Sequence, residues 1–140
     1  MSALVLGAED ADDLQIISAR LQDAVARVGD LVWLPKQRRF AGVFNRFKWE
    51  SGKGLRVRSG LHFDGVLSVK SHNIKRGDAD AVVSLLAISF APKGGEDPGG
   101  TVELMFSGGG AIRLDVECID AGLKDVGGEW AARGRPLHED

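Results

Sequence analysis

From Leu31 to Cys118, turn residues divide the chain into short segments in which apolar side chains alternate with polar ones. A period of two places every second side chain on one face, as in a strand with one buried and one solvated face. Glycine, proline and aspartate recur between these segments at the spacing of antiparallel sheets. The pattern predicts an α+β fold, mostly an antiparallel sheet or partial barrel of about seven strands.

A helix is predicted near each end of this β-rich region. Residues 9–21 repeat apolar side chains with helical spacing, and Asp10 is a suitable N-cap. We expect this helix to end near Gln22, although residues 24–28 fit either its continuation or a new strand. Asp120 and Gly127 are a cap and a stop for a short C-terminal helix over residues 120–126.

Asp64-Gly65 lies between two strand-like segments, Leu55–Phe63 and Val66–Asn73. An Asp-Gly pair suits a type I′ turn, which needs positive φ at both central residues. The pattern therefore predicts a hairpin in which Phe63 is opposite Val66.

A second hairpin is predicted from Thr101–Phe106 and Ala111–Cys118. A three-residue loop over residues 107–109 pairs Leu104 with Ile112 and Val102 with Leu114. The same register sets Glu103 opposite Arg113, which is a favourable cross-strand pair. Alternation with Val116 and Leu114 makes Cys118 a core residue in this interpretation.

The segment between the hairpins begins with an apolar run, Ala81–Ala91, read as a strand with Leu86, Ile88 and Phe90 on one face. Residues 92–100 contain four glycines and two prolines, which predicts a mobile loop. Trp130 is expected to dock on the body of the domain, and residues 134–140 to form a frayed tail.

The length of 140 residues fits a single globular domain over residues 1–140. The N-terminus has no cationic leader, and no apolar run approaches the roughly 20 residues that span a bilayer. The single cysteine cannot form an internal disulfide. Together these features predict a cytoplasmic protein that does not bind a membrane.

The charges are distributed unevenly. Between Lys36 and Arg76 there are eleven Lys or Arg residues and two carboxylates, although the whole chain has a net charge of −2. Five aromatic residues lie in the same segment, which is the composition of a surface for an anionic partner. The ordinary alternative is a solvated sheet face whose cations pair with carboxylates. The candidate partner surface comprises Lys36, Arg38, Arg39, Arg46, Lys48, Arg56 and Arg58.

No catalytic, cofactor-binding or metal-binding residue is nominated. In the predicted first hairpin, His62 and His72 lie on opposite faces and cannot share a metal ion. Gly108-Gly109-Gly110 precedes a strand, whereas a phosphate loop precedes a helix. Acidic neighbours raise the pKa of a thiol such as Cys118 and make it a poor nucleophile.

Several short motifs resemble a known family. They are Leu21-Gln22-Asp23-Ala24, Leu34-Pro35, Arg38-Arg39-Phe40, Asn45-Arg46-Phe47 with Trp49, and Gly108-Gly109-Gly110-Ala111-Ile112-Arg113-Leu114. The chain resembles a small family of uncharacterised alphaproteobacterial proteins that share a domain of unknown function. The resemblance implies a bacterial, cytoplasmic protein and assigns no activity, cofactor or catalytic residue.

Three functional hypotheses remain open from the sequence. The first is a non-enzymatic binding or accessory module that uses its cationic, aromatic-rich surface on a protein or nucleic-acid partner. The second is a small-ligand-binding protein or an enzyme whose site is hidden in the sequence. The third is a self-associating structural protein that forms a homo-oligomer.

Overall fold

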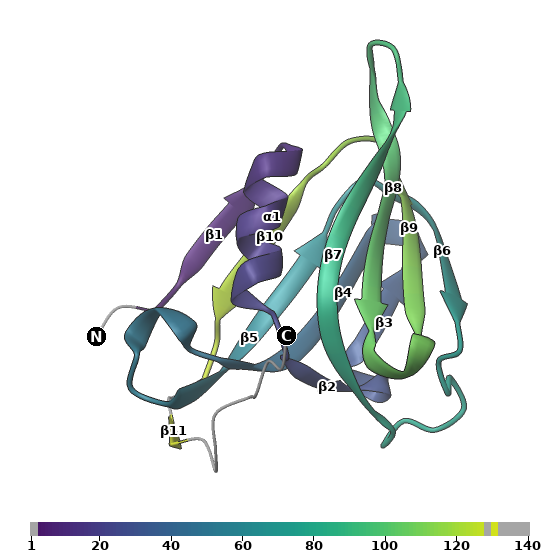
Figure 1. Ribbon diagram of the computed structural model, residues 1–140. Helices are drawn as coiled ribbons and strands as arrows, with labels where there is room; N and C mark the ends of the chain where they lie inside the picture. The colour runs from purple at the N-terminus through teal and green to yellow at the C-terminus, as the bar shows by residue number, and fades with distance from the viewer. Residues whose placement is uncertain (1–2, 128–129, 132–140) are drawn as a thin grey trace.

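The structure is a computed structural model that describes residues 3–127 and 130–131 (Figure 1). One α-helix, α1 (Ala11–Arg20), accompanies eleven strands in this part of the chain. The strands are β1 (Val5–Ala8), β2 (Val25–Arg27), β3 (Leu31–Leu34), β4 (Arg39–Phe47), β5 (Leu55–Phe63), β6 (Val66–His72), β7 (Val82–Gly94), β8 (Asp97–Phe106), β9 (Ala111–Val116), β10 (Ala121–Asp125) and β11 (Trp130–Ala131). Short 3-10 turns follow β2, β3, β4 and β8: η1 (Val28–Asp30), η2 (Pro35–Gln37), η3 (Trp49–Ser51) and η4 (Ser107–Gly109).

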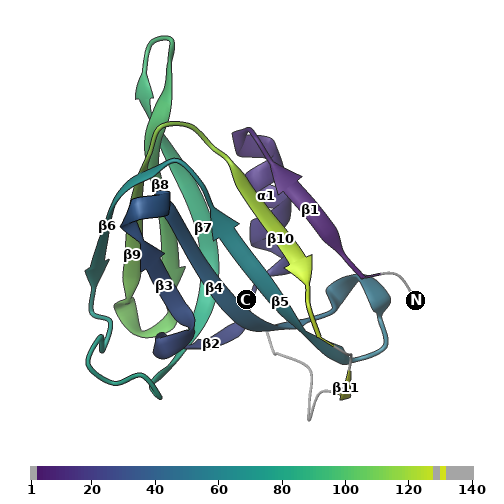
Figure 2. The ribbon, with the colours of Figure 1, turned by 180° about the vertical axis from the view of Figure 1, so that it is seen from behind.

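The strands form a single curved antiparallel sheet in the order β1-β10-β5-β4-β2-β7-β8-β9-β6, with β3 paired to β4 and β11 paired to β5. The prediction of a mostly antiparallel sheet is confirmed, but about seven strands was too few. The sheet curls around its apolar face without closing, because β1 and β6 at its two ends do not pair within the described residues (Figures 1 and 2).

Helix α1 covers the apolar face between β1 and β7 (Figure 1). Asp10 caps it as predicted, since its carboxylate accepts a hydrogen bond from the Asp13 amide at 2.8 Å. Leu14, Ile17 and Leu21 are completely buried, so the predicted apolar stripe is the face that packs on the sheet. The chain after the helix forms strand β2, which resolves the alternative left open for residues 24–28.

The register of the β8–β9 hairpin is confirmed. Val102 pairs with Leu114, Leu104 with Ile112, and Glu103 with Arg113. The Arg113 guanidinium lies 2.8 Å from the Glu103 carboxylate. This hairpin buries its alternating apolar side chains in the core, as the period of two requires.

The hairpin predicted around Asp64-Gly65 is wrong. Strand β5 pairs with β4 and β10, whereas β6 pairs with β9. The Asp64 amide donates to the Asp120 carbonyl oxygen at 2.8 Å, and the Val66 amide donates to the Arg38 carbonyl oxygen at 2.9 Å. Gly65 has φ of +67°, so Asp-Gly supplies a bend that passes the chain from one part of the sheet to another.

The C-terminal helix predicted over residues 120–126 is also wrong. Residues Ala121–Asp125 form β10, which lies between β1 and β5 in the sheet. Cys118 is exposed and not a core residue, because β9 ends at Val116 and Ile119 takes the next buried position. Long-range strand pairing outweighs the local capping signal of Asp120.

Strand β7 departs from the simple alternation expected for it. A bulge between Leu85 and Ala87 turns Leu86 outward, where half of its surface is exposed, while Leu85 and Ile88 are buried. Residues 92–100, predicted as a loop, continue β7 and β8 into a projecting hairpin arm (Figure 1). The mobility of this arm stays a prediction.

The backbone of Trp130 pairs with Arg56 of β5. The tail predicted to fray, residues 134–140, lies outside the described residues.

Candidate functional site

The seven nominated cations do not share one environment. Arg46 is completely buried and Lys48 nearly so, whereas Lys36 and Arg58 are exposed. Arg38 and Arg39 each lie within hydrogen-bond distance of a carboxylate. These residues are close together in the sequence, but in the fold they lie in the interior, on the sheet surface and in the turn before β4.

The four phenylalanines of the same segment are in the core. Phe40, Phe44, Phe47 and Phe63 are each at most 3 % exposed. Phe47 packs against Trp49 with ring centroids 4.6 Å apart, and the Arg56 guanidinium lies 5.9 Å from the Phe47 ring. Because the phenylalanine rings are covered, they offer no face on which nucleic-acid bases could stack.

Arg46 is the centre of a buried polar network. Its guanidinium contacts both oxygens of Asp125 at 3.0 Å and both oxygens of Glu50 at 2.7 and 3.0 Å. Asp125 also accepts hydrogen bonds from the Ser59 hydroxyl at 2.6 Å and from the Leu4 amide at 2.9 Å. The network joins β4, η3, β5, β10 and the residue before β1, and its groups are satisfied by one another, which is the pattern of a structural clamp.

The ionisation of this network follows from its contacts. Burial by itself raises the pKa of Asp125, but hydrogen bonds from Arg46, Ser59 and Leu4 outweigh it and hold the pKa below its ordinary value. The hydrogen bond from Arg46 is the main cause that lowers the pKa of Glu50. Burial lowers the pKa of Arg46, and its hydrogen bonds to the two carboxylates reverse this and raise it. All three groups are therefore charged at neutral pH.

A smaller polar cluster lies on the surface where β4, β5 and the Asp64-Gly65 bend meet. Arg39 contacts Asp64 at 2.7 and 3.2 Å, and this hydrogen bond raises the pKa of Arg39. His62 is 3.6 Å from Asp64. No group of three or more His, Cys, Asp or Glu side chains with metal-binding geometry occurs within residues 3–127.

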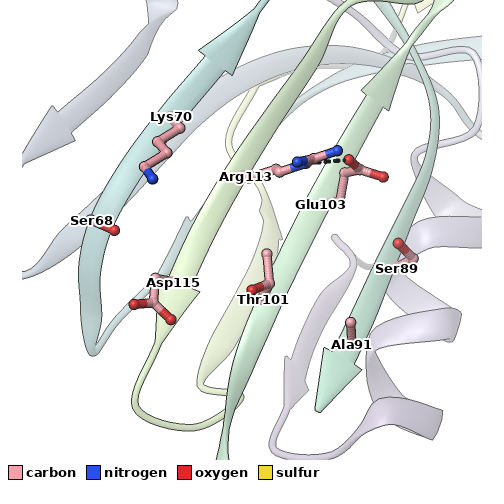
Figure 3. A pocket seen from close by; sticks show the side chains of 8 residues that line it. All are labelled: Ser68, Lys70, Ser89, Ala91, Thr101, Glu103, Arg113 and Asp115. Carbon is pink, nitrogen blue, oxygen red and sulfur yellow. Dashed lines mark hydrogen bonds and ion pairs between the residues drawn. The ribbon is translucent and has the colours of Figure 1, made fainter. Parts of the chain in front are cut away.

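The outer face of β6, β9, β8 and β7 carries a polar hollow, which we call the outer groove (Figure 3). Its volume is about 560 Å³. Its lining consists of charged and short side chains: Ser68, Lys70, Ser89, Ala91, Thr101, Glu103, Arg113 and Asp115. It is open to solvent and lacks an apolar wall.

A second hollow lies where the sheet fails to close, and we call it the seam cavity. Strand β3 pairs with β4, and β6 pairs with β9, but β3 and β6 do not pair with each other in the described part of the chain (Figure 2). The cavity between them has a volume of about 330 Å³. It is lined by Val28, Gly29, Leu31, Trp33, Phe40, Val69, Ser71, Ile74, Arg76, Ala79 and Ile112.

The two ends of the seam are fixed by the backbone. At one end the Val66 amide donates to the Arg38 carbonyl oxygen. At the other end the segment between β6 and β7 is tied to η1, since the Gly29 amide donates to Ala79 at 2.9 Å and the Val28 amide to Ala81 at 2.8 Å. The seam cavity is therefore held open between two anchored ends.

Sequence reasoning missed the seam cavity. It depends on β6 pairing with β9, whereas the sequence predicted that β6 pairs with β5. Arg76 lies in the basic segment but outside the candidate partner surface predicted from it. The alternation of Val69 and Ser71 on β6 was visible, but it carries no information about which strand lies opposite.

Comparison with known proteins identifies a family and no characterised relative. A family model described as "Protein of unknown function (DUF2948)" matches residues 4–138. No curated protein and no solved structure matches the chain. Among the described residues, no helix is long and apolar enough to cross a membrane.

Proposed function

This chain belongs to the DUF2948 family, whose function is unknown, and we propose that it is a binding module that holds a small amphipathic anion in the seam cavity. The observation that carries the proposal is a cavity with apolar walls and one cationic side chain, Arg76, in a gap of the sheet. Ligand sites in proteins are mostly apolar concave surfaces with a few polar groups that fix orientation.

The apolar core reaches the surface at this cavity. Leu31, Trp33, Val69 and Ile74 pack against the core but remain partly exposed. Phe40 and Ile112 form the deeper wall and are at most 4 % exposed. A ligand with an apolar body that covers the partly exposed side chains gains about 25 cal/mol for each Å² removed from water. The volume of about 330 Å³ is within the range of small-molecule sites.

Arg76 supports an acidic group on the ligand. Its side chain has no hydrogen-bond or ion-pair partner among the described residues, unlike Arg38, Arg39 and Arg46. A guanidinium binds carboxylate and phosphate oxygens through two parallel hydrogen bonds. A ligand that places its apolar part in the cavity and its acid at Arg76 therefore satisfies both parts of the lining.

The nucleic-acid form of the binding hypothesis has less support. Its four phenylalanines are buried, and its cations are divided among different environments. A small ligand requires neither a continuous basic surface nor exposed rings, so it agrees better with the observed positions.

The proposal is tested by titrating sodium hexanoate, sodium octanoate and 1-octanol into ¹⁵N-labelled protein and following amide chemical shifts. Saturable shifts are expected at Val69, Ser71 and Ile74. Octanoate should bind roughly tenfold more tightly than hexanoate, because each buried methylene contributes about 0.8 kcal/mol. Absence of saturable shifts with all three probes would contradict the proposal.

Two variants on the same strand separate the cavity from the rest of β6. Val69 lines the cavity, whereas Leu67 is exposed and does not. Val69→Phe should fill the cavity and abolish octanoate binding, and Leu67→Phe should leave it unchanged. Arg76→Gln should weaken octanoate about tenfold and leave 1-octanol unaffected, since a charge-assisted hydrogen bond contributes roughly 1.5–3 kcal/mol and this one is partly solvated. Lys75→Gln is the matched control, and equal effects of Arg76→Gln on both probes would contradict the anionic ligand.

A further inference from the structure

The hollow of the outer groove results from the different lengths of the side chains that line it. Two rows of residues cross the four strands, one formed by Lys70, Arg113, Glu103 and Ser89, the other by Ser68, Asp115, Thr101 and Ala91. Long charged side chains dominate the first row, and short ones dominate the second. The hollow is thus built into the outward-facing positions of β6, β9, β8 and β7, which the register fixes (Figure 3).

Two cations face each other in the first row. Lys70 is directly opposite Arg113 in the β6–β9 ladder, and like charges in this position repel each other. Arg113 is compensated on its other side, where its Nε donates to Glu103 at 2.8 Å. Lys70 is on the last strand of the sheet and has no carboxylate partner among the described residues.

The second row supplies a carboxylate without a partner. Asp115 is opposite Ser68 on one side and Thr101 on the other, and no ion pair or hydrogen bond engages its side chain within residues 3–127. It lies diagonally across from Lys70 in the β6–β9 ladder. The groove therefore presents an uncompensated ammonium and an uncompensated carboxylate, and its four charged residues sum to zero.

We propose that the outer groove is a second binding site, which takes a small zwitterion of the amino-acid class. The ligand carboxylate accepts hydrogen bonds from the Lys70 ammonium and the Nη atoms of Arg113, which the Glu103 contact leaves free. The ligand ammonium donates to Asp115. The hydroxyls of Ser68 and Thr101 are available to polar groups on the ligand side chain.

The spacing of the rows suits a ligand with two opposite charges close together. Residues two apart on a strand are roughly 7 Å apart along it. That spacing is of the same order as the length of a small molecule whose carboxylate and ammonium are joined through one carbon, so each end of such a ligand can reach one row. A simple anion is disfavoured because it brings its charge close to Glu103 and Asp115 without compensating them.

The experiment compares L-serine with the two fragments that each keep one of its charges: 3-hydroxypropanoate, which keeps the carboxylate, and ethanolamine, which keeps the ammonium. Each is titrated into ¹⁵N-labelled protein at constant ionic strength. L-Serine should shift the amides of Lys70, Arg113 and Asp115 saturably and bind at least tenfold more tightly than either fragment. Equal affinity for the three probes, or no saturable shift with L-serine, would overturn the proposal.

Two variants test which protein side chain binds each charged end of the ligand. Lys70→Gln should reduce L-serine affinity and leave ethanolamine affinity unaffected. Asp115→Asn should reduce L-serine affinity and leave the affinity for 3-hydroxypropanoate unchanged or higher. All are surface changes that should keep the fold, and Lys53→Gln in the exposed loop before β5 is the matched control. Loss of L-serine binding in Lys53→Gln to the same degree would show that the response is not specific to the groove.

This site is independent of the seam cavity. Lys70 faces the outer groove, and Val69, its neighbour in sequence, faces the seam cavity. Octanoate binding should therefore survive Lys70→Gln, and L-serine binding should survive Val69→Phe. Failure of either probe alone identifies which of the two proposals is wrong.

Discussion

The guanidinium of Arg46 contacts the carboxylate of Asp125 at 3.0 Å, although the two residues are 79 positions apart in the sequence. The Arg46 side chain is completely buried and that of Asp125 is 3 % exposed. Taking both charges out of water is costly, and the cost is offset because each partner is also hydrogen-bonded to other groups. The pair connects β4 with β10, and so ties the middle of the sheet to the strand next to its first edge.

Removing one member of this pair should destabilise the fold strongly. Arg46→Met leaves the Asp125 carboxylate buried without its main partner, which typically costs about 3–5 kcal/mol. Arg58→Met, on the exposed face of the adjacent strand, should cost less than about 0.5 kcal/mol. Urea unfolding followed by circular dichroism measures both, and similar losses in the two variants would show that the buried pair has no special role.

The same network should make stability depend on pH in the acidic range. The folded-state pKa values of Asp125 and Glu50 are below their ordinary values of about 3.9 and 4.3, so their contribution is fully present above those values. It is lost as pH falls below those ordinary values and through the folded-state pKa values. Urea midpoints measured from pH 7 to pH 3 should fall more steeply for the wild type than for Asp125→Asn. An equal slope in the two proteins would contradict this origin.

The bulge in β7 predicts opposite sensitivities for two neighbouring apolar residues. Ile88 is 1 % exposed and Leu86 is 50 % exposed. Ile88→Ala should cost about 2–5 kcal/mol because it leaves a cavity in the core. Leu86→Ala should cost less than about 0.5 kcal/mol, as is usual for a surface position. If the two residues shared one face, as simple alternation suggests, chemical denaturation would show large losses for both.

Two glycines in strands should respond differently to an added methyl group. A Cβ on Gly100 meets the Ala91 carbonyl oxygen and lies 2.8 Å from Phe90 Cζ, whereas the nearest atom to a Cβ on Gly7 is 4.0 Å away. Gly100→Ala should destabilise by about 1–3 kcal/mol through overpacking. Gly7→Ala should be neutral or slightly stabilising, because it lowers the entropy of the unfolded chain. Thermal unfolding of both variants checks this, and a neutral Gly100→Ala would mean that β7 and β8 are less closely packed there.

The features that sequence alone predicted correctly are those set by near neighbours. The cap of α1 joins residues three positions apart, Asp10 and Asp13. The β8–β9 register follows from a three-residue loop, the apolar alternation and the Glu103–Arg113 pair. In each case the interacting groups are close along the chain, so the residues that decide the structure lie within one short window of sequence.

The features that sequence missed depend on distant partners. Asp64-Gly65 fits a hairpin turn and also fits a bend, and the choice was made by β10, whose neighbour Asp120 accepts the Asp64 amide hydrogen bond. Asp120 likewise fits the N-cap of a helix, since local preference does not show that β1 and β5 leave room for a strand between them. Both errors come from the same non-local pairing.

The candidate sites also combine features set by local sequence with features set by distant partners. The sequence by itself determined the strand pattern, the alternation of β6 and the concentration of cations between Lys36 and Arg76. The tertiary structure decided that Arg46 is buried beside Asp125, that β6 pairs with β9, and that a cavity with Arg76 in its lining lies between β3 and β6. Alternation specifies which side chains share a face of a strand. The backbone hydrogen-bonding groups are the same for every sequence, so they do not specify which strand pairs with which. Packing of the core therefore selects the strand pairing when the whole chain folds.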